Sequence, residues 1–259
     1  MSAHSQPAAR HAHALLWLAL LATAALALHG PIVQWADYHD FADTRAWGSL
    51  PHAWNVLSNL PFAAAALWAW PRLRDAGAAW RSFCAAIAVT AFGSMLYHWQ
   101  PNDLSLLIDR LPIAWACAAL LCAFLAERVN ARWQSPAVVG IALVGGTLAV
   151  AWWGVGNALG TGDLRPYVLV QFMPMLLIPA ALMLRLQPVT AAAVPAWPWW
   201  TALALYAGAK GVEAADEAVL ELTLHSISGH SLKHLLAALA AGVLLHSRAS
   251  NRPRRDQLR

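Results

Sequence analysis

Eight stretches of the chain are each long enough and apolar enough to cross a membrane as one helix. About 20 mostly apolar residues span the hydrocarbon core of a bilayer, and long runs without alternation favour helices over strands. Only 12% of the 259 residues are charged, against about 25% in a soluble domain. We therefore expect an all-α integral membrane protein. The stretches are 14–33, 54–70, 80–99, 104–126, 136–155, 166–185, 197–216 and 226–247.

Basic residues are distributed unevenly between these stretches. If the N-terminus is cytoplasmic, twelve of the 17 lie in cytoplasmic segments, and only Arg45 and Arg165 lie in outer loops. Because basic residues concentrate on the cytoplasmic side, the pattern predicts eight spans with both termini cytoplasmic. It also explains the net charge of +4 without nucleic-acid binding. We expect the first stretch to be an uncleaved helix; a signal peptide is the alternative, which Arg10 and the small residues around Ala27 would also fit.

Ionisable residues within the predicted spans concentrate at one depth. Such groups are costly inside a membrane, so each is a candidate for function. In the expected topology, His98, Asp109, His230 and His234 all fall near the outer ends of their spans. His230 and His234 are one helical turn apart, so both imidazoles can reach one metal ion, and His98 is the natural third ligand. Three protein ligands plus water is the usual arrangement of catalytic zinc, so the pattern predicts a zinc site near the outer face.

Two residues close to these histidines have more than one interpretation. Ser94 shares a helical face with His98, and its spacing alone indicates a packing residue. Asp109 precedes Arg110, and adjacent helical residues point about 100° apart, so an ion pair between them is unfavourable. We therefore expect Asp109 to face the bundle and Arg110 to point out of it.

Further polar residues lie in the same layer. Lys210 and Glu213, three residues apart, are expected to form a structural ion pair. Asp216 is a candidate partner for a histidine N–H. The segment 55–59 contains two asparagines and a serine, for which we expect hydrogen bonds between helices. The three cysteines lie in apolar stretches and are expected to be buried, free thiols.

Four short motifs resemble the alkaline ceramidase family, in its bacterial branch. The family belongs to a superfamily of seven-helix membrane hydrolases that includes the adiponectin and progestin receptors. The resemblance covers roughly residues 37–246, and the combined spacing of the motifs is more specific than any one of them. The motifs are TrpAsnValLeuSerAsnLeuProPhe at 54–62, GlySerMetLeuTyrHis at 93–98, AspArgLeuPro at 109–112 and HisSerLeuLysHis at 230–234.

The resemblance implies a site and a domain plan. Its zinc ligands are His98, His230 and His234, and Ser94 and Asp109 are the catalytic residues. Residues 34–247 are the implied seven-helix membrane domain. Residues 1–33 are then an N-terminal tail with an extra helix, and 248–259 a basic cytoplasmic tail. The expected location is a bacterial inner membrane, with the site towards the outer, non-cytoplasmic side and a membrane lipid as substrate.

An acidic segment precedes the first core helix, where eukaryotic family members bind calcium. Asp37, Asp40 and Asp43 partly resemble that segment and are candidates for a calcium-like site. The chain departs from the pattern at His52, because those members carry glutamate two residues before the TrpAsn pair. Calcium is therefore a weaker expectation than zinc.

The function that we expect is zinc-dependent hydrolysis of the amide bond of an N-acyl, ceramide-like lipid. One alternative is hydrolysis of another lipid bond, such as an ester, at the same site. Two others are a haem protein with histidine ligands and a receptor or structural metalloprotein that binds lipid without turnover. A serine–histidine protease is disfavoured, because nothing marks Ser94 as a nucleophile and a third histidine would have no role.

Overall fold

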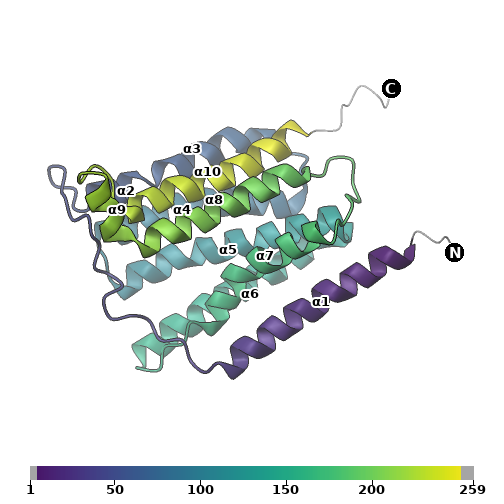
Figure 1. Ribbon diagram of the computed structural model, residues 1–259, viewed down its shortest axis with the longest axis horizontal. Coiled ribbons are helices and arrows are strands. Elements are labelled where there is room, and N and C mark those ends of the chain that lie inside the picture. The colour runs from purple at the N-terminus through teal and green to yellow at the C-terminus, as the bar shows by residue number, and fades with distance from the viewer. Residues whose placement is uncertain (1–4, 252–259) are drawn as a thin grey trace.

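The chain folds into a bundle of helices (Figure 1). The computed structural model describes residues 5–251, and within them it has ten α-helices, two short 3-10 helices and no strand beyond an isolated bridge between Trp47 and Leu50. The all-α prediction is confirmed for these residues, and positions 252–259 of the predicted tail lie outside them. The α-helices are α1 (Ser5–Leu28), α2 (Ala53–Leu57), α3 (Leu60–Ala69), α4 (Gly77–Trp99), α5 (Asp103–Arg128), α6 (Pro136–Ala158), α7 (Arg165–Met183), α8 (Ala196–Ala214), α9 (Asp216–Leu222) and α10 (Gly229–Ser250).

Five of the described helices are long and apolar enough to cross a membrane. They are α1, α4, α5, α6 and α7, and each overlaps one of the predicted stretches. These helices fit an integral membrane protein. The predicted count of eight spans, seven of them in the core, is not confirmed.

The other three predicted spans depart from a continuous apolar helix. The stretch 54–70 is divided into α2 and the ten-residue α3 at Ser58 and Asn59. Pro61 lies in the first turn of α3, where a missing N–H costs nothing, so the helix restarts there readily. Helices α8 and α10 have 19 and 22 residues, but charged and histidine side chains interrupt their apolar character.

Helix α1 lies at one edge of the bundle, as Figure 1 shows, and packs mainly on α7. Only 6% of its apolar window is buried, and large side chains such as Trp17 and Leu21 are exposed. An exposed apolar surface of this length is typical of a helix whose partner is lipid. The helix therefore joins the bundle through a small part of its surface, where Leu15 is buried in the core.

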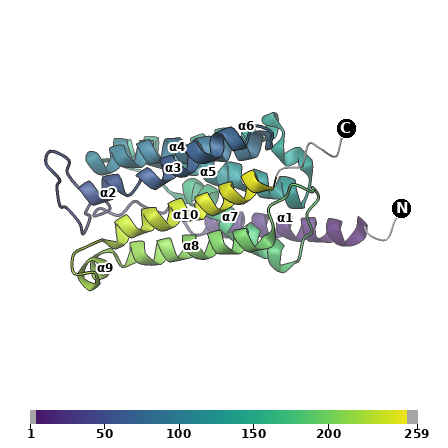
Figure 2. The same cartoon turned by 90° about the horizontal axis from the view of Figure 1, so that it is seen from above.

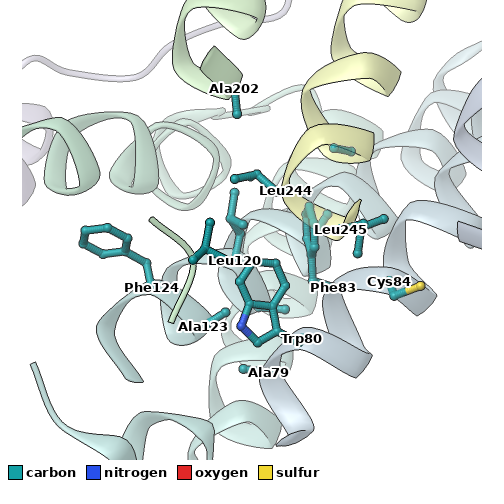
Figure 3. Close-up of a cluster of buried hydrophobic side chains, with 14 of the residues drawn as sticks. Ala79, Trp80, Phe83, Cys84, Leu120, Ala123, Phe124, Ala202, Leu244 and Leu245 are labelled. Carbon is teal, nitrogen blue, oxygen red and sulfur yellow. The ribbon is translucent and has the colours of Figure 1, made fainter. Parts of the chain in front are cut away.

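The apolar core joins α4, α5, α8 and α10. Figure 3 shows Trp80 and Phe83 of α4 close to Leu120 of α5 and to Leu244 and Leu245 of α10. Each of these side chains is less than 9% exposed. Alanines fill half of the remaining core positions, and small residues allow close helix contacts in membranes. This core fixes the helices whose far ends carry the candidate site.

The two ends of the bundle differ in chemistry. Figures 1 and 2 show the start of α1 and the end of α10 at one end of the bundle, and α2 and α9 at the other. At the end with the termini, Glu127 of α5 accepts hydrogen bonds of 2.9 Å from Trp80 Nε1 and from the backbone N–H of Val194. Arg248 of α10 pairs with the same carboxylate. The predicted site residues lie at the opposite end, because α4 ends there while α5 and α10 begin there.

Candidate metal centre

The three predicted ligands lie on two helices that meet at the end of the bundle away from the termini. His98 is in the last turn of α4, and His230 and His234 are in the first two turns of α10. Their exposed fractions are 1%, 8% and 5%. Burial of three imidazoles requires partners for their ring nitrogens, so the positions of those nitrogens decide what the cluster can do.

One ring nitrogen from each histidine lies within 4.8 Å of the other two. Nε2 of His98 and Nε2 of His230 are 3.3 Å apart. Zinc–nitrogen distances of about 2.05 Å in a tetrahedron place neighbouring ligand atoms about 3.3 Å apart. The cluster could therefore hold one metal ion. Among residues 5–251 it is the one group of three or more histidine, cysteine or acidic side chains with this geometry.

Ser58 sets the tautomer of His234. Its hydroxyl donates to the carbonyl of Asn55 at 3.1 Å, and it lies 2.8 Å from Nδ1 of His234. A hydroxyl that donates elsewhere accepts from Nδ1–H, and this leaves Nε2 of His234 unprotonated and free to bind a metal. The amide of Asn59 lies beside the same nitrogen, at 3.3 Å. The expected hydrogen bonds between helices are confirmed, and their target is a predicted ligand.

The other two rings are covered by an aromatic side chain from the loop before α2. The ring of Phe41 lies edge-on to those of His98 and His230, with 4.8 Å between centroids in both pairs. Nδ1 of His98 is buried without a hydrogen-bond partner. An unpartnered ring nitrogen in a dry environment is costly, and His98 therefore lacks the outer hydrogen bond that usually orients a metal-binding histidine. Sequence reasoning did not identify Phe41, since one apolar loop residue carries no signal.

The start of α10 is held rigidly against the turn between α8 and α9. A Cβ atom on Gly229 would overlap the carbonyl of Val212, so only glycine permits this approach. Asp216 accepts hydrogen bonds from the backbone N–H of His230 at 2.6 Å and from that of Ala42 at 3.1 Å. The carboxylate thus positions the backbone of a ligand residue, whereas the sequence predicted that it would accept from an imidazole.

Ser94 and Asp109 come together where α4 and α5 approach most closely. Both side chains are buried and line one cavity, and Oδ1 of Asp109 has no hydrogen-bond partner among the described residues. A Cβ atom on Gly93 would lie 2.8 Å from the carbonyl oxygen of Ile108, so this glycine lets the two backbones meet. The apposition places an alcohol and a carboxyl group beside the histidine cluster.

A cavity of about 210 Å³ runs from this polar group into the core. Ser94, Asp109 and His234 line it at the histidine end. Deeper in the bundle its lining is apolar and includes Phe83 and Leu244. The cavity therefore has the composition of a site for a molecule with one polar and one apolar part.

Arg110 lies inside the bundle, and the prediction that it points outward is wrong. It is 4% exposed, and one of its guanidinium nitrogens donates to Gln34 at 2.5 Å. Its guanidinium carbon is 4.2 Å from the ring centroid of Trp153, with Tyr38 and Tyr167 at 5.2 Å. Cation–π contacts of this kind stabilise a desolvated arginine. The loop before α2 supplies two of these partners, which sequence spacing on the helix does not reveal.

The predicted ion pair between Lys210 and Glu213 is confirmed, and a second lysine joins it. Lys210 contacts one carboxylate oxygen of Glu213. Lys233 of α10 lies 2.6 Å from the other oxygen. One carboxylate thus links α8 to α10 through two lysines, and all three side chains line the cavity.

The acidic segment before α2 does not gather into a metal-binding group in the described chain. Asp37 and Asp40 are exposed, whereas Asp43 is buried and pairs with Arg45 at 2.6 Å. Burial raises the pKa of Asp43, but hydrogen bonds and the charge of Arg45 outweigh it and hold the pKa below its ordinary value. Arg45 also bonds the carbonyl of His225. The segment therefore fastens the loop before α2 to the loop before α10.

Comparison with models of known protein families and with curated proteins finds no match for the chain.

Proposed function

We propose that the protein is a zinc-dependent membrane hydrolase that cleaves the amide bond of an N-acyl lipid. The observation that carries the proposal is the three-histidine cluster, whose member His234 lines, with Ser94 and Asp109, the polar end of a cavity with an apolar depth. The resemblance of four motifs to the alkaline ceramidase family supports it.

The residues around the cluster fit the needs of amide hydrolysis. Bound zinc would lower the pKa of a coordinated water towards about 7. Asp109 is the general base that accepts the proton of the attacking water and then transfers it to the leaving amine nitrogen. Ser94 donates a hydrogen bond to the carbonyl oxygen of the substrate, where negative charge develops. Ser58 keeps His234 in the metal-binding tautomer.

The apolar part of the cavity is the binding site for the acyl chain. His234 and Leu244 both line it and are ten residues apart on α10, so the lining extends over about 15 Å. A carbon chain advances by less than its bond length of about 1.5 Å per atom, so a chain on the order of ten carbons fits this depth. The scissile amide then lies at the histidine end.

The arrangement of the bundle supports a seven-helix core with α1 as an addition. In this proposal α2 and α3 together, and each of α4 to α8 and α10, cross the bilayer. Both termini are cytoplasmic and the histidine cluster lies towards the outer side of a bacterial inner membrane. The start of α1 and the end of α10 lie at the same end of the bundle (Figure 1), and this position and the predicted distribution of basic residues support the topology.

The alternatives predict different results. A haem iron with two histidine ligands requires rings on opposite faces of the macrocycle, whereas the rings of His98, His230 and His234 meet at 4.7 to 5.0 Å between centroids. A receptor or structural metalloprotein would bind zinc and lipid without forming product.

The test is a panel of matched lipid amides and esters incubated with purified protein, with free fatty acid measured by mass spectrometry. We expect fatty acid from an amide. Asp109→Asn should abolish turnover while leaving zinc bound, because the carboxylate acts on the proton rather than on the metal. Full activity in Asp109→Asn would refute its role. Release of fatty acid only from the esters would replace the amide with an ester as the substrate bond.

A further inference from the structure

The cavity carries more positive than negative charge. Its charged lining residues are Arg110, Lys210 and Lys233 against Asp109 and Glu213. Glu213 uses both of its oxygens on the two lysines, and Arg110 contacts a neutral amide and aromatic rings. With ordinary charges on all five groups, one positive charge remains uncompensated.

An uncompensated charge in this position is costly. Lys233 of α10 is 19% exposed and lies above an apolar cavity, where water screens its charge poorly, whereas Lys210 of α8 is 43% exposed. A structural bridge between two helices requires one lysine and one carboxylate. The second lysine adds a positive charge that a ligand with a negative group would neutralise.

The charges act at the reacting end of the cavity. Lys233 lies between the predicted ligands His230 and His234 on α10, and it lines the same cavity as Asp109. A negative group bound here would be near the proposed position of the amide. The apolar depth of the cavity would still receive the acyl chain.

We propose that the substrates are N-acyl lipids with an anionic group close to the amide nitrogen, as in an N-acyl amino acid, and that Lys210, Glu213 and Lys233 select them. The inference rests on the proposed amide hydrolase function for the orientation of the substrate. The lysines bind the anion by charge-assisted hydrogen bonds, and Glu213 holds them in place.

The experiment compares two lipids that differ in one charge, N-dodecanoylglycine and its neutral amide, N-dodecanoylglycinamide. Equilibrium binding to the full-length protein is measured in a neutral detergent, and intact lipid and product are quantified in the same samples. We expect the anionic lipid to bind about tenfold more tightly, the size of one charge-assisted hydrogen bond. Equal binding, or no binding of either lipid, would overturn the inference.

Variants of opposite sign separate recognition from a structural role. Lys210→Met removes the more exposed lysine and should reduce the preference for the anionic lipid. Glu213→Gln adds one net positive charge and should increase that preference. A bridge needed only for folding would change the binding of both lipids alike in both variants, and that result would refute selection by the lysines.

The two proposals fail in different ways. If the anionic lipid binds preferentially but no lipid is hydrolysed, the anionic specificity is supported and the hydrolase function is refuted. If both lipids are hydrolysed and bind with equal affinity, the hydrolase function is supported and the anionic specificity is refuted.

Discussion

Substitution of Ser58 by alanine should weaken zinc binding without removing a ligand. The hydroxyl lies 2.8 Å from Nδ1 of His234 and donates to the carbonyl of Asn55. In Ser58→Ala the Nδ1–H of His234 loses this acceptor. The tautomer with an unprotonated Nε2, which can bind a metal, is then no longer favoured. Loss of a hydrogen bond to a metal-binding histidine typically lowers metal affinity by 10- to 100-fold. The nearby amide nitrogen of Asn59 is a donor and cannot accept from Nδ1–H in place of the hydroxyl, so we expect a loss of at least about tenfold, or about 1.4 kcal/mol.

The assay is competition for zinc between the purified protein and a chelator of known affinity. Ser247→Ala is the matched control, because Ser247 is a buried serine on α10, at the end of that helix opposite to His234. Thermal melting in detergent establishes that both variants are folded. Unchanged zinc affinity in Ser58→Ala, or an equal loss in Ser247→Ala, would refute the role of this hydroxyl.

Three further outcomes are expected. Gly93→Ala should lower the free energy of unfolding by about 1–3 kcal/mol in denaturant titration, because its Cβ would lie 2.8 Å from the carbonyl oxygen of Ile108. The pKa of Asp43 is below its ordinary value in the folded protein, so its ion pair with Arg45 stabilises the fold above about pH 4, and this stabilisation is lost as the pH falls. Asp43→Asn lacks this pH-dependent contribution. Its melting temperature should therefore decline less steeply than that of the wild type as the pH is lowered. Leu244→Trp should fill the deep end of the cavity and shift the chain-length profile of turnover towards shorter acyl chains.

The glycine prediction has a matched control in α6, and the other two variants are compared with the wild type. Gly140 of α6 has open space where a Cβ would lie, so Gly140→Ala should cost little; an equal cost in both glycine variants would contradict the close approach of α4 and α5. Identical pH profiles for wild type and Asp43→Asn would contradict the depressed pKa. An unchanged chain-length profile in Leu244→Trp would place the acyl chain elsewhere.

Helix positions were well predicted where apolar runs are long and uninterrupted. The stretches 80–99, 104–126 and 136–155 lie within two or three residues of α4, α5 and α6 at both ends, since composition and turn residues alone set those boundaries. The stretch 54–70 was predicted as one helix because its residues are mostly apolar. The break at Ser58 and Asn59 depends on their tertiary contacts with α10, which hydropathy does not encode.

The site was predictable to the extent that it depends on depth and helical spacing. Alternating direction of the spans places His98 and His230 at one level, and a four-residue interval places His234 beside them. Contacts from loops were not predictable in the same way. Phe41 covers the cluster and Arg110 turns inward because the segment before α2 folds back over the bundle end, and no periodic pattern in the sequence reports that packing.

The central claim is that the three histidines bind zinc. The most direct test is elemental analysis of the detergent-purified protein beside a His230→Ala, His234→Ala double variant, with zinc supplied during growth. About one zinc per chain in the wild type, lost in the variant, is the result that the geometry of the cluster predicts. A wild-type protein without zinc, or a variant that retains it, would contradict the claim.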